Sequence, residues 1–93
     1  MGIITNTHEG LKSITGDLNI TTLESNADVL IKGNDGGASI TALTLDMSDS
    51  GTALFNHHLS IPDYIVHTGD ASTRFGFSAS STFVVNTGGT TRL

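Results

Sequence analysis

The chain has 93 residues, a formal net charge of −5 at pH 7, and neither cysteine nor tryptophan. This length leaves room for one domain at most, and the lack of cysteine excludes a disulfide framework. The four basic residues are too few and too scattered for phosphate contacts, so we expect no nucleic-acid partner. No stretch of 18 apolar residues exists, so we expect no membrane insertion.

The composition predicts a β-rich chain with a thin core. Thr, Ser, Gly, Asn and Asp together account for 48 residues, and these residues favour turns and short strands over helix interiors. Bulky aromatic residues are scarce, with four Phe and one Tyr. Because so little apolar surface is available, we expect a single copy to have a marginal interior that needs help from outside.

Three segments are predicted along the chain. Residues 1–28 form an N-terminal β segment or connector, with a short alternation of apolar and polar residues at Leu18 and Ile20. Residues 29–61 form the second segment, and residues 62–93 form the third. The second segment opens with the run 29–31 (VLI), which is apolar at every position and predicts a strand buried on both faces.

Strands with one apolar face are predicted where apolar residues recur at every second position. The second segment shows this alternation at Leu43, Leu45 and Met47, and again at Leu59 and Ile61. The third segment shows it at two places: Phe75, Phe77 and Ala79, then Phe83 and Val85. No window keeps a helical spacing of apolar residues, so we expect essentially no helix.

Turn signals separate these strands at intervals of roughly ten residues, which predicts about eight short strands. Gly, Asn and Asp tolerate the positive φ angles that tight turns demand. The predicted turn residues are Gly33, Asn34, Asp35, Gly36, Gly69, Asp70, Gly88 and Gly89.

Two all-β architectures are compatible with such strands. A small sandwich needs bulky residues in a two-sided core, and this chain has few. We therefore expect an elongated fibre in which three intertwined copies share one core and pair their strand edges. The residues predicted to form this shared core are Leu43, Leu45, Met47, Phe55, Leu59, Ile61, Phe75, Phe77, Phe83 and Val85.

Two strings of the sequence resemble structural proteins of tailed bacteriophages, in particular their tail fibres. The first is LIKGNDGGASITALTLDMSDSGTALFN and the second is IPDYIVHTGDASTRFGFSASSTFVVNTGGTTRL. Together they cover about residues 29–93. The resemblance implies a homotrimeric β-helical or β-prism fibre in the virion, extracellular when assembled, in contact with other tail proteins. It further implies a role in host attachment, with a host surface glycan or receptor as a possible partner. The resemblance does not extend to a receptor-binding tip or a self-cleaving chaperone domain.

Candidate metal and turn sites have structural alternatives. The adjacent pair His57 and His58 could place one imidazole near a three-fold axis and bind a metal there, but no Asp or Cys ligand accompanies the pair. Asp35 lacks the ligand spacing of a calcium loop, so a tight turn is the favoured interpretation. His67 and Asp70, in HTGD, are also interpreted as a turn, in which the carboxylate accepts from His67 or from a backbone N–H.

No catalytic residues and no cofactor are expected. The only glutamates, Glu9 and Glu24, are far apart in sequence, and nothing in the spacing of the aspartates selects the carboxylate pair that a glycosidase needs. Two non-enzymatic alternatives stay open. The chain could be a monomeric glycan-binding adhesin in which an exposed Tyr64 stacks on sugar, or the subunit of an open-ended extracellular filament.

Overall fold

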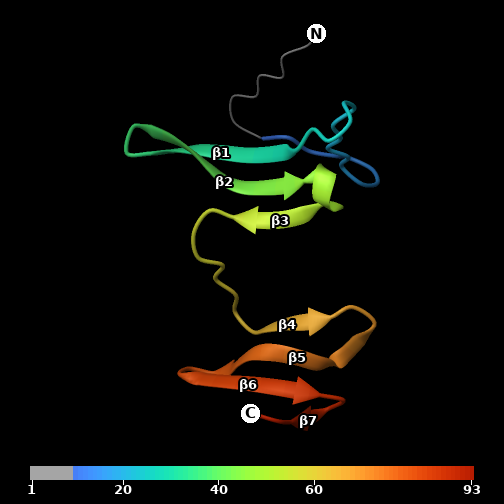
Figure 1. Cartoon of the computed structure of the whole chain (residues 1–93), viewed down its shortest axis with the longest axis vertical. Coiled ribbons are helices and arrows are strands. Elements are labelled where there is room, and N and C mark those ends of the chain that lie inside the picture. Colours follow the sequence, from blue (N-terminus) through green and yellow to red (C-terminus); the bar gives the residue numbers. More distant parts are fainter. Residues whose placement is uncertain (1–9) are drawn as a thin grey trace. The chain divides into compact units, whose positions relative to one another are not determined.

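The protein is all-β, as the sequence predicts, and forms two separate antiparallel sheets, neither of which closes into a barrel (Figure 1). The computed structural model describes residues 10–93. Glu9 and the first part of the predicted N-terminal segment lie outside this range. The chain divides into two units between His57 and His58, and each unit contains one sheet.

The first unit carries a three-stranded sheet of order β1-β2-β3. Its elements are β1 (Val29–Asp35), β2 (Ala38–Asp46), the 3-10 turn η1 (Met47–Asp49) and β3 (Thr52–Phe55). The turn between β1 and β2 consists of Gly36 and Gly37 alone, with φ angles of 61° and 100°, which is the two-residue hairpin geometry that favours glycine.

The glycine-rich turn is therefore shorter than predicted. Gly33, Asn34 and Asp35 belong to β1, where they pair with Ile40, Ser39 and Ala38, and only Gly36 of the predicted set lies in the turn. Asn34 still shapes the turn, because its Oδ1 accepts a hydrogen bond from the N–H of Gly37 at 2.7 Å. The side chain of Asn34, near the end of β1, thereby stabilises the hairpin turn.

Strand β2 ends before Met47, so the prediction of a strand through this residue was wrong. Asp46 caps η1 by accepting from the N–H and hydroxyl of Ser48, and Asp28 accepts from the N–H of Met47 at 2.9 Å. Side-chain acceptors of this kind satisfy backbone donors outside the sheet ladder. Ser50 then adopts a left-handed conformation, with φ of 55°, and the chain turns back into β3.

The second unit carries a four-stranded sheet of order β4-β5-β6-β7. Its strands are β4 (Tyr64–His67), β5 (Asp70–Ala79), β6 (Thr82–Thr87) and β7 (Thr90–Thr91). Gly69, Gly88 and Gly89 lie in the turns with positive φ, as predicted. Asp70 is instead the first residue of β5.

Two short predicted strands are absent. Residues 10–28 and 56–63 contain neither helix nor strand, so the alternations at Leu18 and Ile20 and at Leu59 and Ile61 do not form strands. Two apolar residues around one polar residue are too short to define a strand without a pairing partner. Pro62 also follows Ile61 directly, and proline cannot donate to a ladder.

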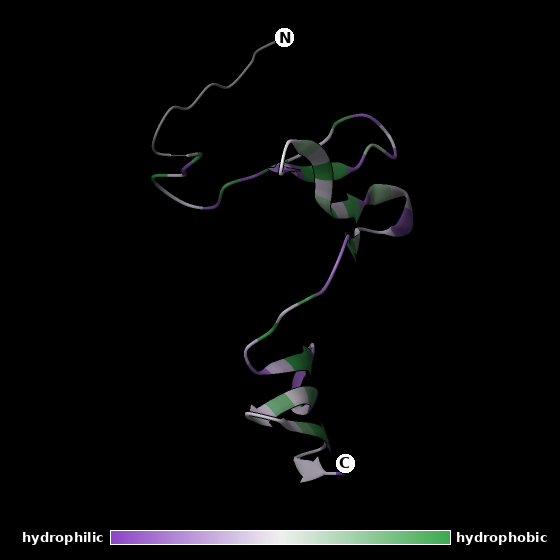
Figure 2. Ribbon diagram, turned by 90° about the vertical axis from the view of Figure 1, so that its left-hand side faces the viewer, coloured by the Kyte–Doolittle hydropathy of each residue, from purple (hydrophilic) through white to green (hydrophobic). Residues whose placement is uncertain are grey.

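No apolar side chain is fully buried in the part of the chain that the structure describes. Leu30 and Ile31 remain 47% and 50% exposed, so in the single chain the run 29–31 is not buried on both faces. Apolar and polar residues are interleaved along the strands of both sheets (Figure 2).

Gly76 in β5 is the one fully buried residue between positions 10 and 93. Its φ is 156°, and a Cβ here would overlap the carbonyl oxygen of Asp63 and lie 2.8 Å from Cα of Tyr64. Asp63 lies this close to β5 because the N–H of Phe77 donates a hydrogen bond to the carbonyl oxygen of Asp63 at 2.7 Å. The close approach of Asp63 to β5 therefore requires glycine at position 76.

We expect Gly76→Ala to lower the free energy of unfolding by about 1–3 kcal/mol through this overlap. Gly33→Ala is the matched control, because its Cβ would meet nothing within 4 Å and alanine at an unstrained site is neutral or slightly stabilising. Urea unfolding followed by circular dichroism measures both variants. Equal midpoints for the two would contradict the close approach.

Candidate assembly surface

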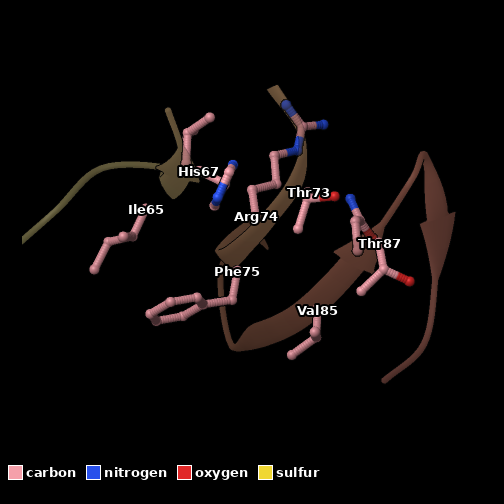
Figure 3. Close-up of a pocket in the computed structure, with 9 residues that line it drawn as sticks. Ile65, His67, Thr73, Arg74, Phe75, Val85 and Thr87 are labelled. Atoms are coloured by element: carbon pink, nitrogen blue, oxygen red, sulfur yellow. The ribbon is translucent and has the colours of Figure 1, made fainter. Parts of the chain in front are cut away.

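One face of the second sheet is built from apolar residues of three neighbouring strands. In the register of the sheet, Phe75 lies between Ile65 and Val85, and Phe77 lies opposite Phe83. Directly paired residues, and residues two apart on a strand, share a face. Figure 3 shows Ile65, Phe75 and Val85 projecting to one side of the sheet, whereas Arg74 extends to the other. We call this surface, made of Ile65, Phe75, Phe77, Phe83 and Val85, the aromatic face.

The aromatic rings on this face contact one another yet stay accessible. The ring centroid of Phe83 lies 5.8 Å from that of Phe77 and 6.4 Å from that of Phe75, in tilted and edge-on arrangements that aromatic pairs favour. All three side chains nevertheless remain 45–50% exposed. The rings stabilise the local pairing of β5 and β6 without forming a closed interior.

A hollow of about 320 Å³ lies next to this cluster (Figure 3). Its apolar lining comes from Ile65, Val66, Phe75 and Val85. The polar residues that line it are His67, Thr73, Arg74, Asn86 and Thr87. The aromatic face therefore consists of two parts: paired rings at one end and a depression beside them.

The opposite face of the same sheet is more polar. Its paired residues include Tyr64 with Gly76, and Arg74 with Asn86. The guanidinium carbon of Arg74 lies 4.0 Å from the centroid of the Tyr64 ring, a cation–π contact. Tyr64 is half-buried, so the exposed, sugar-stacking tyrosine of the adhesin hypothesis is not what the structure shows. One face of its ring is already occupied by arginine.

The first sheet carries apolar residues on both faces, and on one of them Thr44 lies between Leu30 and Leu54. The other face is almost entirely apolar. Leu43 pairs with Ile31 on one side and Phe55 on the other, and Leu45 pairs with Val29 and Ala53. These pairs place six apolar side chains on one face, which we call the aliphatic face: Val29, Ile31, Leu43, Leu45, Ala53 and Phe55. Phe55 is 47% exposed, so this face also lacks a cover within the described part of its own unit.

The structure brings together most, though not all, of the residues predicted to form a core. Leu43, Leu45 and Phe55 share the aliphatic face, and Phe75, Phe77, Phe83 and Val85 share the aromatic face. Met47, Leu59 and Ile61 lie outside the strands. Whether these residues form a trimer core remains a prediction.

Sequence reasoning missed four members of the two faces: Val29, Ile31, Ala53 and Ile65. Each lies in a stretch where neighbouring positions are also apolar, such as YIV at 64–66. Alternation alone cannot assign such residues to a face. Only their pairing partners, for example Phe75 for Ile65, decide the side.

The histidines predicted as candidates do not occupy the expected positions. His57 and His58 lie in the stretch after β3 and not on a strand, so they do not point to opposite faces of a sheet. Among residues 10–93, no group of three or more His, Asp or Glu side chains is arranged to hold a metal ion. His67 pairs across the β4–β5 turn with Asp70, and the carboxylate of Asp70 accepts hydrogen bonds from Ser72 and Thr73.

Asp70 organises the turn at one end of β5. Its Oδ1 accepts from the hydroxyl of Ser72 at 2.7 Å and from the N–H of Ser72 at 3.1 Å, and its Oδ2 accepts from the hydroxyl of Thr73 at 2.8 Å. Thr73 in turn accepts from the N–H of Gly88 at 3.1 Å. The cluster thereby ties the start of β5 to the turn after β6, beside the hollow.

The comparisons with known proteins find no matching protein family, no matching curated protein and no matching solved structure. Across residues 10–93, no helix has the length and apolar character needed to cross a bilayer.

The carboxylate of Asp70 predicts a pH dependence of stability. The hydroxyl of Ser72, and then the hydroxyl of Thr73 and the N–H of Ser72, hold the pKa of Asp70 below its ordinary value of 3.8. A carboxyl whose pKa is depressed by folding stabilises the folded state above its unfolded pKa, and this contribution is lost as the pH falls through the folded pKa.

We therefore expect the melting temperature of the wild type to exceed that of Asp70→Asn above pH 4, with the difference shrinking at lower pH. Ser72→Ala should raise the pKa of Asp70 towards 3.8, because it removes the largest stabilising donor. NMR titration of the Asp70 carboxyl carbon measures this pKa directly. An unchanged midpoint in Ser72→Ala would contradict the assigned cause.

Proposed function

We propose that this chain is a homotrimeric structural segment of a virion fibre, of the kind found in phage tail fibres, and that it supports attachment to the host cell. The observation that carries the proposal is the uncovered apolar face of each sheet. The aliphatic and aromatic faces hold eleven apolar side chains, and none of them is fully buried.

Association of copies supplies the burial that the single chain lacks. Full burial of a side chain such as Leu or Phe contributes about 1.5–3 kcal/mol, and the exposed rings of the aromatic face realise only part of this in one copy. A small domain with so little interior is stabilised by oligomerisation when neither a disulfide nor a metal is present. A fibre of wound copies is one such solution.

The location of the phage-like strings also supports the proposal. The string that begins at Leu30 spans most of the first sheet, and the string that begins at Ile61 spans the whole second sheet. The resemblance therefore follows the two structural units, and the number of copies, three, comes from this resemblance. Other virion proteins at the fibre ends and a host glycan or receptor are the partners that this role implies.

The filament alternative has one observation in its favour. The outer edges of β1, β3 and β4 carry backbone groups that no strand of their own sheet pairs, and such edges can accept a strand from another copy. The adhesin alternative requires a self-sufficient monomer, and the exposed apolar faces together with the covered Tyr64 ring disfavour it.

We expect Leu45→Asp to abolish folding and trimer formation together, because it places a charge in the middle of the aliphatic face. Ser39→Asp is the matched control: it adds the same charge to the same strand at an exposed position that pairs with Asn34. Sedimentation velocity and circular dichroism measure mass and folding. A folded, monomeric Leu45→Asp protein would show that the chain has a sufficient interior of its own.

Electron microscopy tests the role in a fibre. We expect the purified chain to form particles of definite length and three-fold mass, and immunogold labelling to mark the tail fibres of virus particles that carry this gene. Filaments of indefinite length without virions would favour the extracellular filament, and unlabelled virions would contradict the proposal.

A further inference from the structure

Residues 17–23 have the sequence of a strand, although no strand of the described chain pairs with them. Leu18 and Ile20 flank Asn19, and two threonines continue the alternation, yet this stretch contains neither helix nor strand. The side chains of Leu18 and Ile20 are 47% and 62% exposed, and that of Leu23 is 95% exposed. Such a stretch gains ladder hydrogen bonds and apolar burial when the edge of a sheet accepts it.

One hydrogen bond at the border between β2 and β3 shows how the backbone groups of β2 are directed. The carbonyl oxygen of Ala42 accepts from the N–H of Asn56 at 3.0 Å, so this carbonyl points to β3. The N–H of Leu43 belongs to the same trans peptide group and points the opposite way, to β1. Because hydrogen-bonded residues alternate along an antiparallel strand, Leu45 also directs its N–H and C=O to β1.

The outer edge of β1 is therefore open at alternate residues. Ile31 and Val29, the partners of those two leucines, direct their backbone groups to β2. Leu30 and Lys32 then direct their N–H and C=O groups outward. No strand between positions 10 and 93 pairs with this edge, so its backbone groups are available to another strand.

The turn before β1 keeps residues 17–23 of the same copy out of phase with this edge. The N–H of Ala27 donates to the carbonyl oxygen of Glu24 at 3.1 Å, which closes a turn with two central residues. In a hairpin continued from this turn, Thr22 and Val29 would be the next hydrogen-bonded pair. The backbone groups of Val29 point to β2 instead, so the strand that pairs with the edge has to come from another chain.

Residues 17–23 of a second copy match this edge. Directly opposite residues of an antiparallel pair share a face, and pairs of apolar residues or of opposite charges are favourable there. One register places both apolar residues of the alternation on the aliphatic face and the carboxylate next to a cation: Leu18 opposite Ile31, Ile20 opposite Val29, and Asp17 opposite Lys32. A shift by two residues in either direction loses the charge pair and one of the apolar pairs.

We infer that residues 17–23 of one copy add as an antiparallel strand to the outer edge of β1 in the next copy, an inference that rests on the proposed homotrimer. The first sheet thereby gains a fourth strand, and its aliphatic face gains two side chains. Different segments meet across this contact, which makes it heterologous, and heterologous contacts close as rings when the rotation between copies permits. In a ring of three, every donated segment and every edge is used once.

Disulfide trapping tests this contact in the full-length chain, which has no cysteine of its own. We expect Asp17→Cys/Lys32→Cys to give covalent trimers under oxidising conditions, because hydrogen-bonded antiparallel partners place their Cα atoms about 5.5 Å apart, within disulfide range. Thr21→Cys/Lys32→Cys is the matched control. Position 21 is on the same face of the donated strand but about 13 Å further along it, so this variant should give little covalent product.

The outcomes separate this inference from the proposed function. Trimers of Asp17→Cys/Lys32→Cys that stay uncrosslinked, or that crosslink no better than the control, would overturn the strand donation and leave the trimer intact. A folded monomer with an internal disulfide would show pairing within one copy and overturn both. A ladder of covalent products beyond the trimer would support the donation and contradict the closed trimer.

Hydrogen exchange tests the same contact without cysteines. In the assembled wild type, we expect the N–H of Leu30 to exchange about tenfold or more slowly than in Asn19→Pro. In the inferred register Asn19 lies opposite Leu30, and proline removes a donor from the added strand. Residues 17–23 contribute no ladder hydrogen bond to their own sheet, so Asn19→Pro should keep the wild-type circular dichroism spectrum. Equal exchange rates in the two proteins would overturn the inference.

Discussion

A sheet that forms a single layer leaves both of its faces without a cover, including the face on which its apolar side chains gather, and the rest of the structure depends on this constraint. In each unit the pairing of strands gathers apolar side chains on one side, as with Leu43 beside Ile31 and Phe55. No further layer within the described part of either unit packs against that side, so the side chains remain partly in water. Hydrophobic stabilisation scales with the apolar area removed from water, and in the proposed trimer contact between copies supplies the missing part of it.

Clusters of hydrogen-bonded polar side chains lie at the strand ends. They help to set the strand register, and the register decides which side chains form the apolar faces. Asp46 with Ser48, and Asp70 with Ser72, form the same local arrangement, in which a carboxylate accepts from the N–H and hydroxyl of the serine two residues later. These clusters fix where a strand ends or begins and thereby help to set the register. A slip of one residue would turn every side chain of a strand to the other face, so turn geometry and face composition depend on each other.

The two faces have different chemistry and suit different contacts. The aliphatic face consists of four branched aliphatic side chains together with Ala53 and Phe55, whereas the aromatic face combines exposed rings with a hollow. On the other side of the second sheet, the contact of Arg74 with Tyr64 covers one face of the Tyr64 ring. The proposed association between copies is supported by the uncovered apolar faces of the two sheets.

The sequence by itself determined the all-β class, the near absence of helix, half of the predicted turn residues and the alternation in β2, β5 and β6, because all of these follow from local preferences for φ and from the period of two along a strand. It could not determine the end of β2 before Met47, which depends on Asp28, a residue far away in sequence. It also could not assign Val29, Ile31 and Ile65 to a face, because their neighbours are equally apolar. Only the tertiary structure decided these points, together with the hollow beside the aromatic rings, since hydrogen bonds between distant residues set the register and the register decides which side chains meet.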